Sequence, residues 1–165
     1  RDRSPSRGLG DVYKRQVVMR TSWVFGAHGQ NFVKTMLRLG RERDSLGIVA
    51  DQYGAPTAAA DIAAALITIV CRHTPEQLAE RAGIYHYCGS PYASWFEFAE
   101  TIFAEAAAQG VLAKIPAVKP IATADYPTPA KRPADSRLDC GKIRAVFGIG
   151  PCDWHSALSD LRPYL

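Results

Sequence analysis

The chain has 165 residues, of which 47% are hydrophobic and 22% charged, and its formal net charge at pH 7 is +4. This composition is typical of a globular protein and excludes a disordered or fibrous chain. No apolar run reaches the roughly 18 residues of a membrane-spanning helix, and no apolar stretch of signal-peptide type stands at the N-terminus. We therefore expect a protein without a membrane partner.

The basic excess lies almost wholly in residues 1–16, which hold five basic and two acidic side chains. The remaining residues are nearly balanced and give no reason to expect nucleic acid as a partner. Residues 1–16 show no apolar periodicity, and the stretch 11–16 is what GAT-GTG-TAT-AAG-AGA-CAG encodes, which resembles a transposon end used in sequencing libraries. We expect residues 1–16 to be a non-native, adapter-derived segment and residues 17–165 to be the native part; the alternative is a genuine basic tail.

Short apolar runs and helical patterns alternate along the rest of the chain. Strands are predicted over 17–20, 46–50 and 83–87. Helices are predicted over 32–39, 58–72, 95–106, 139–147 and 153–161. Asn31 is a suitable N-cap and Gly40 a suitable stop for the first helix, while Ser94 and Glu97 have capping-box spacing.

Two segments have a composition that restricts their environment. The predicted helix over 58–72 is apolar almost all round, which is typical of a helix buried on several sides. Residues 116–133 contain five prolines, which exclude a helix and predict loop or edge strand. The alternation of strands and helices indicates an α/β fold.

Local motifs for catalysis are missing from this sequence. No G-x-G-x-x-G follows a strand, and no Tyr-x-x-x-Lys pair is present, since Tyr126 and Lys131 are one residue too far apart. The four cysteines form no C-x-x-C pair, and neither they nor the histidines have metal-ligand spacing. We predict no catalytic residue and no metal site in this chain, and buried free thiols typical of a reducing cytoplasm.

Polar residues gather in three loops between apolar elements, where binding residues usually lie. The first, 20–23, follows a strand end, where ligands bind in open α/β sheets, and Trp23 could lie flat on a sugar or a base, or pack against the next helix. The second loop covers 52–57. In the third, Arg132 could hold a diphosphate between its guanidinium nitrogens, or be a solvated surface side chain.

Seven segments, in this order, resemble the dTDP-4-dehydrorhamnose reductase family. They are 18–26, 31–33, 51–57 with Asp61, 83–86, 94–95 with Phe98 and Ala99, 127–130 with 132–133, and 136–139 with Lys142. Each motif alone is weak, but together they cover essentially all of residues 17–165.

The resemblance implies an extended short-chain dehydrogenase/reductase that reduces dTDP-4-dehydro-L-rhamnose to dTDP-L-rhamnose for cell-surface polysaccharide. In that family NADPH or NADH supplies the hydride from a Rossmann domain, and a Tyr-x-x-x-Lys pair supplies the proton. Because that pair and the nucleotide fingerprint are missing here, we expect a C-terminal fragment that is inactive by itself. Its fold would be the last part of a Rossmann-like doubly wound parallel sheet plus a small α/β substrate-binding domain.

The resemblance also assigns site residues. Trp23 is expected to contact the rhamnosyl ring, and Thr21 and Ser22 to border the nicotinamide. Further polar residues are expected near the sugar nucleotide: Asn31, Gln52, Thr57 and Arg132. No catalytic residue can be carried over.

Two other functions remain open. The chain could belong to an extended-type epimerase or dehydratase acting on another nucleotide sugar, because these enzymes share the scaffold. It could also be a non-catalytic partner resembling the regulatory subunit of methionine adenosyltransferase. A homodimer is left open. If the sheet is truncated, apolar faces should be exposed at 17–19, 48–49 and 62–70, and the isolated chain should be poorly soluble or partly molten.

Overall fold

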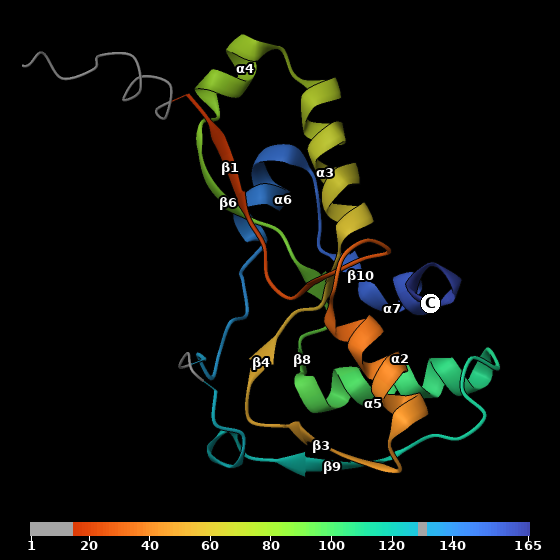
Figure 1. Cartoon of the computed structure of the whole chain (residues 1–165). Coiled ribbons are helices and arrows are strands. Elements are labelled where there is room, and N and C mark those ends of the chain that lie inside the picture. The colour runs from red at the N-terminus through yellow and green to blue at the C-terminus, as the bar shows by residue number, and fades with distance from the viewer. Residues whose placement is uncertain (1–14, 129–131) are drawn as a thin grey trace, which may run out of the picture.

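The computed structural model describes residues 15–128 and 132–165, and within these ranges the chain forms two lobes (Figure 1). The first lobe, at the top of Figure 1, holds β1 (Val17–Arg20), α3 (Ala59–Arg72), α4 (Pro75–Glu80), β6 (Gly83–His86) and α6 (Gly141–Phe147). Strands β1 and β6 are parallel, with Val17 opposite Gly83 and Arg20 opposite His86. Helices α3 and α6 supply Ile69, Ile143 and other side chains to the core beside this pair.

The second lobe, at the bottom of Figure 1, holds α2 (Phe32–Glu42), β3 (Ser45–Val49), α5 (Trp95–Ala108), β9 (Ala117–Ile121) and the short helix η1 (Thr123–Asp125). Its strands β3 and β9 are also parallel. Helices α2 and α5 pack together over them, and the fully buried Val33, Phe98 and Ile102 belong to this core.

Short strand pairs join the lobes. They are β2 (Val24–Phe25) with β5 (Thr57–Ala58), β4 (Tyr53–Gly54) with β8 (Ala93–Ser94), and β7 (Gly89–Ser90) with β10 (Cys152–Asp153). Only β4–β8 is antiparallel among the strand pairs of the described ranges. The fold is thus mixed α/β with parallel pairing, as the sequence predicted.

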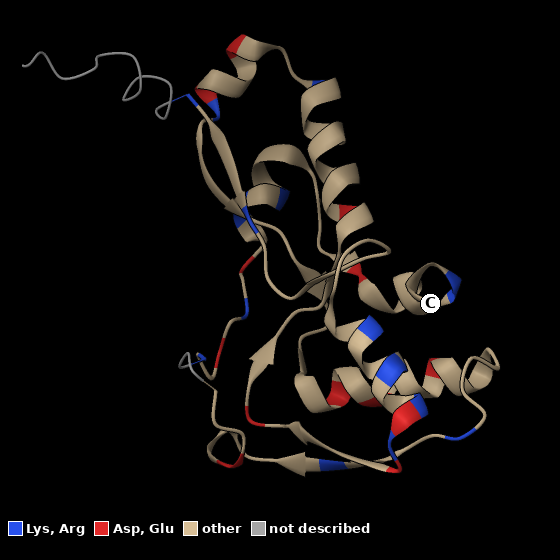
Figure 2. Cartoon of the chain, viewed as in Figure 1, with Lys and Arg blue, Asp and Glu red and all other residues tan. Residues whose placement is uncertain are grey.

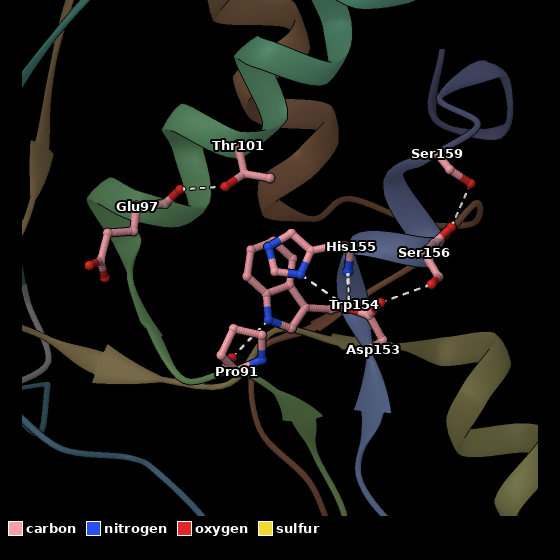
Figure 3. A network of polar contacts seen from close by, with 8 residues as sticks. All are labelled: Pro91, Glu97, Thr101, Asp153, Trp154, His155, Ser156 and Ser159. Atoms are coloured by element: carbon pink, nitrogen blue, oxygen red, sulfur yellow. Dashed lines mark hydrogen bonds and ion pairs between the residues drawn. The ribbon is translucent and has the colours of Figure 1, made fainter.

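The C-terminal helix α7 (Trp154–Leu158) is followed by η2 (Arg162–Tyr164). Two sets of contacts hold α7 in place. The Nε1 of the buried Trp154 donates to the Pro91 carbonyl oxygen at 2.8 Å. Asp153 caps α7 by accepting from the backbone N–H of His155, whose ring stacks on Trp154 (Figure 3). The predicted helix over 153–161 is therefore shorter, and that over 139–147 begins at Gly141.

The sequence was right about the start of α2 and wrong about its end. Asn31 Oδ1 accepts from the Lys34 backbone N–H, as an N-cap does. Gly40 does not end the helix, which continues to Glu42. A Cβ at Gly40 would lie 2.8 Å from Leu112 and 2.9 Å from Phe103, so this glycine allows α2 and α5 to approach closely.

Helix α3 differs from its prediction in burial. Ala65 and Ile69 are buried, but Ile67 is 61% and Val70 64% exposed. The expectation that α3 is buried on several sides is wrong for the described chain, because no described element covers its outer face. The expected exposure at 48–49 is also wrong, since both residues are buried in the second lobe.

No helix within the described residues is both long and apolar enough to cross a membrane. Figure 2 shows that acidic and basic residues are interspersed along the ribbon of both lobes.

Candidate functional site

Trp23, between β1 and β2, is the centre of a cluster of side chains and backbone from four segments. Its ring stacks on that of Trp95 at the start of α5, with centroids 3.6 Å apart and planes at 9°. Its Nε1 donates to Ser136 Oγ at 3.0 Å. Its backbone φ is +46°, an uncommon value for a residue other than glycine. The orientation of this indole is therefore fixed by contacts from distant parts of the chain.

Gly54 in β4 is required for this arrangement. A Cβ at this position would overlap the six-membered ring and Nε1 of Trp23. Only glycine lets the β4 backbone pass so close to the indole. Trp23 is thus enclosed by Gly54 and Trp95, and its remaining exposed surface is what a ligand can reach.

The segment 132–137 lies alongside β4. The Tyr53 N–H donates to the Ala134 carbonyl, and the Ser136 N–H donates to the Tyr53 carbonyl, both at 2.8 Å. The Ser136 hydroxyl also donates to the Tyr53 carbonyl at 3.0 Å. These bonds hold Ser136 where it accepts from Trp23.

Arg137 lies between two exposed tyrosines beside this cluster. Its guanidinium carbon is 5.9 Å from the ring centroid of Tyr53 and 5.7 Å from that of Tyr92. It also donates to both carboxylate oxygens of Asp135, at 2.9 and 2.7 Å. These hydrogen bonds lower the pKa of Asp135 to about 2. The result is an exposed surface of aromatic and charged groups.

Gln52 and Thr57 both lie next to the Trp23 cluster and are engaged within the protein. The buried Gln52 donates from Nε2 to Thr123 Oγ1 at 3.0 Å. The Thr57 N–H donates to the Trp23 carbonyl at 3.1 Å. Its hydroxyl donates to the Ala55 carbonyl and accepts from the Gly89 N–H. Both side chains therefore position the loop 52–57.

Thr21 and Ser22 stand at the carboxyl end of β1. Thr21 is exposed, and the Ser22 hydroxyl lies 3.4 Å from the Ala55 carbonyl, to which it donates. The structure thus brings Ser22, Trp23 and the loop 52–57 together.

Asn31 and Arg132 are placed differently. The amide of Asn31 is committed locally, since Nδ2 donates to the Gly26 carbonyl at 2.7 Å while Oδ1 caps α2. Asn31 lines a separate cavity of about 1040 Å³ beside β2, α3 and α7. Arg132 is exposed. Lys131, which precedes it in the third polar loop, lies outside the described residues.

The cavity beside Asn31 is mainly apolar but has three aspartates in its lining. Asp153 pairs with His155 at 3.1 Å and Asp160 with Arg162 at 2.6 Å. The third, Asp61, lies in the first turn of α3. Asp160 therefore already has a cationic partner, and Asp153 already has a hydrogen-bonding one.

The described residues include no metal-binding cluster, and around Thr21 and Ser22 they form only part of a dinucleotide site. The described ranges contain no group of three or more His, Cys, Asp or Glu side chains that could hold a metal ion. Thr21 and Ser22 could border a nicotinamide, but no glycine-rich turn opens a helix beside them to receive a diphosphate. These residues do not amount to a site for NADPH.

Cysteine reactivity is a direct test of the first lobe. Cys88 is buried, and burial, reinforced by its contact with Cys140, raises the pKa of its thiol to about 12. The expectation of buried thiols is wrong for Cys71, which is exposed near the end of α3. Because the thiolate is the reactive form, Cys88 should be labelled far more slowly than Cys71 at pH 8. Labelling with a disulfide reagent followed by peptide mass spectrometry should find Cys71 modified first. Equal labelling of Cys88 in the folded chain would contradict the packing of this core.

Sequence reasoning did not assign Trp95, Ser136 or Arg137 to the site. Trp95 belongs to an apolar helical stripe, so its pattern indicated core and nothing else. Ser136 is 113 residues from Trp23 in the sequence, and no local pattern predicts that contact. The one available signal was Gly54, a glycine inside a polar loop, which often marks close backbone approach.

Parallel strand pairs, with a polar cluster after the carboxyl end of β1, define a Rossmann-like α/β protein. The chain belongs to the RmlD substrate binding domain family, whose model matches residues 9–163.

Two similar proteins of known name are both dTDP-4-dehydrorhamnose reductases. The chain is 53% identical over 150 residues to the dTDP-4-dehydrorhamnose reductase of Aggregatibacter actinomycetemcomitans, covering 91% of this chain and 51% of that protein. It is 45% identical over 144 residues to the reductase of the same name from Sinorhizobium fredii, covering 87% of this chain and 48% of that protein. The chain therefore spans about half the length of these relatives.

A solved structure agrees with the sequence comparison. The crystal structure of dTDP-4-dehydrorhamnose reductase from Bacillus anthracis in complex with NADP superposes with a TM-score of 0.73 at 34% identity. The match covers 86% of this chain and 46% of that one. The expected family and fold class are thereby confirmed.

Proposed function

We propose that this chain is the substrate-binding half of a cytoplasmic dTDP-4-dehydrorhamnose reductase and that it binds the dTDP-sugar. The likeness to the Aggregatibacter and Sinorhizobium reductases carries the proposal. The proposal concerns residues 17–165, which would combine the last Rossmann-like elements with the substrate-binding lobe. The whole enzyme would reduce dTDP-4-dehydro-L-rhamnose to dTDP-L-rhamnose.

Within this half, Trp23 presents its free indole surface to the sugar ring. An aromatic ring that is already held by Trp95, Gly54 and Ser136 loses little freedom when a ligand binds, so the site is preorganised. Gln52 and Thr57 act by fixing the loop beside Trp23. The exposed Arg132 would bind the diphosphate through its guanidinium. Asn31 would contribute indirectly, because its Nδ2 donates to the Gly26 carbonyl and so closes the loop 26–31.

The cofactor belongs mainly to the other half of the enzyme. NADPH supplies the hydride when it is bound, while Thr21 and Ser22 border its nicotinamide from this side. The proton donor also lies outside this chain, because no Tyr-x-x-x-Lys is present in the sequence. By itself the chain should bind sugar nucleotide and leave NADPH unoxidised.

The test is binding of dTDP-L-rhamnose, measured by calorimetry, to the chain alone and to the chain with the half of the Aggregatibacter reductase that it does not match. We expect Trp23→Ala to weaken binding by about tenfold or more, since an aromatic contact contributes on the order of 1 kcal/mol beyond its buried area. Trp23→Phe keeps a ring against Trp95 but loses the hydrogen bond to Ser136. Its affinity should therefore lie between those of the parent chain and Trp23→Ala.

Other nucleotides distinguish the alternatives. Binding of UDP-sugars in preference to dTDP-sugars would favour an epimerase or dehydratase. No sugar-nucleotide binding in either arm would overturn the proposal and favour a non-catalytic partner. Oxidation of NADPH by the chain alone with dTDP-4-dehydrorhamnose would overturn the assignment of the proton donor to the other half.

A further inference from the structure

Two cysteine thiols that the candidate site does not use lie in contact inside the first lobe. Cys88 follows β6, and Cys140 precedes α6, 52 residues further along the chain. Their Sγ atoms are 3.5 Å apart, and the two residues are only 1% and 9% exposed. Both belong to one buried apolar cluster, so packing from several elements holds the two sulfurs together.

The carbonyl oxygen of Leu138 orients both thiols. Cys88 Sγ donates to this oxygen at 3.5 Å, and Cys140 Sγ donates to it at 3.9 Å. The hydroxyl of Tyr92 donates to the same oxygen at 2.9 Å. A thiol is a weak donor compared with a hydroxyl. The Leu138 carbonyl would therefore keep its main hydrogen bond if both thiol protons were lost.

The contact between the two sulfurs needs little change to become a covalent bond. The sulfurs of a disulfide are about 2.05 Å apart, so the gap of 3.5 Å would have to close by about 1.5 Å. Groups that are already held together lose little freedom when they react with each other. A bond between Cys88 and Cys140 is thus favoured over a bond from either sulfur to a small thiol.

The other two cysteines have different surroundings. Cys152, in β10, lies beside Tyr87 and Asp61, and Cys71 is exposed near the end of α3. All four cysteines lie in the described ranges, and the sulfur–sulfur contact there is that of Cys88 with Cys140. The fold therefore selects one pair out of the six that four cysteines allow.

We propose that Cys88 and Cys140 are an oxidation site at which hydrogen peroxide forms a reversible disulfide bond. Cys140, the more exposed of the two, attacks one peroxide oxygen as its thiolate. The O–O bond breaks, Cys140 becomes a sulfenic acid and hydroxide leaves. The Cys88 sulfur then attacks the Cys140 sulfur, and the sulfenic oxygen leaves as water with the Cys88 proton. In total, two thiols lose two electrons and two protons, and one peroxide becomes two water molecules.

The disulfide would join two segments that build the candidate site. Ser136, which accepts from Trp23, lies four residues before Cys140. Gly89, whose N–H donates to Thr57 Oγ1, directly follows Cys88. A cross-link between residues so far apart in the sequence restricts the unfolded chain, so the oxidised protein should resist unfolding better than the reduced one. The proposal does not depend on the proposed function.

The test starts from the chain with Cys71→Ser, which removes the exposed thiol and with it cross-linking between copies. The folded chain is treated with hydrogen peroxide, its remaining thiols are alkylated, and it is analysed by mass spectrometry. We expect the loss of two hydrogen atoms and, after digestion without reductant, a peptide carrying Cys88 joined to one carrying Cys140. Dithiothreitol should restore both thiols, and the urea midpoint should be higher before this reduction than after it.

Serine variants in the same background separate this pair from the third remaining cysteine. Cys88→Ser and Cys140→Ser should each abolish the cross-link and the rise in urea midpoint. Cys152→Ser is the matched control, because it removes a half-buried thiol outside the pair and should retain both effects. Near-ultraviolet circular dichroism of the reduced variants shows whether each remains folded.

Refolding in a glutathione redox buffer tests the pair without requiring peroxide to enter the folded core. Oxidised glutathione takes up the same two electrons and leaves as two glutathione thiols. The same Cys88–Cys140 peptide should form. Intact thiols after both treatments, cross-links that involve Cys152 instead, or a Cys140 sulfinic acid without a cross-link would each overturn the proposal.

Discussion

Replacing Gly89 by alanine is expected to lower the free energy of unfolding by more than about 3 kcal/mol, beyond the usual range for overpacking. A Cβ at this position would overlap the carbonyl oxygen of Pro56 and lie 3.1 Å from Cδ1 of Trp154. The obstacle on one side is backbone and on the other a fully enclosed ring. Neither can shift without disturbing buried neighbours, because Pro56 and Trp154 are both fully buried.

The effect should extend to both lobes. Gly89 pairs with Cys152, and its N–H donates to the hydroxyl of Thr57, which is completely buried. Displacing β7 therefore disturbs the loop 52–57 on one side and the Trp154 anchor of α7 on the other. We expect the change to affect unfolding as a whole.

Urea unfolding monitored by near-ultraviolet circular dichroism provides the measurement. Gly150→Ala is the matched control, because a Cβ there would have open space around it. The free energy of unfolding of Gly150→Ala should stay within about 0.5 kcal/mol of that of the parent chain, as for most surface substitutions. A Gly89→Ala midpoint equal to that of Gly150→Ala would show that β7 is not packed as described.

Local signals were sufficient to predict much of this fold. The capping box of Ser94 and Glu97 is present, with the Ser94 N–H donating to Glu97 Oε2 at 2.6 Å and the Glu97 N–H to Ser94 Oγ at 3.1 Å. The proline-rich segment contains β9, which pairs only with β3 in the described chain and so is an edge strand. These features depend on residues within one turn or one strand, which explains why sequence patterns found them.

Features set by distant contacts were missed. Gly40 has the sequence signature of a helix stop, yet contact with Phe103 and Leu112 makes it a packing position inside α2. Helix α4 was not predicted, because its six residues contain too short a pattern, although Thr74 and Gln77 form a capping box. The apolar pattern of α3 correctly indicated a helix but could not say which element would cover it.

The candidate site follows the same division. The strand-end position of Thr21, Ser22 and Trp23 was readable from the sequence, because polar residues follow an apolar run there. The enclosure of Trp23 by Trp95 and Ser136 was not, since these residues come from three separate segments. Binding of the sugar nucleotide by the predicted residues stays a prediction, which the binding experiments test.

Gly54→Ala should have the largest effect on the candidate site itself. The added methyl group would overlap the indole of Trp23, which Trp95 and Ser136 hold from other directions. Either the Trp23–Trp95 stack or the β4–β8 pairing must open. We expect a loss of about 1–3 kcal/mol in stability, as for an overpacked site, and a weaker near-ultraviolet signal from the stacked indoles.

Ligand affinity should fall together with the stack. If Trp23 presents its surface to the sugar ring, its displacement removes an aromatic contact and the preorganisation that supports it, so dTDP-L-rhamnose should bind about tenfold more weakly. Gly150→Ala should retain both the signal and the affinity. Unchanged affinity in Gly54→Ala, with the stack shown to be disrupted, would mean that the sugar does not contact Trp23 and that the exposed surface of Tyr53, Tyr92 and Arg137 is the next place to examine.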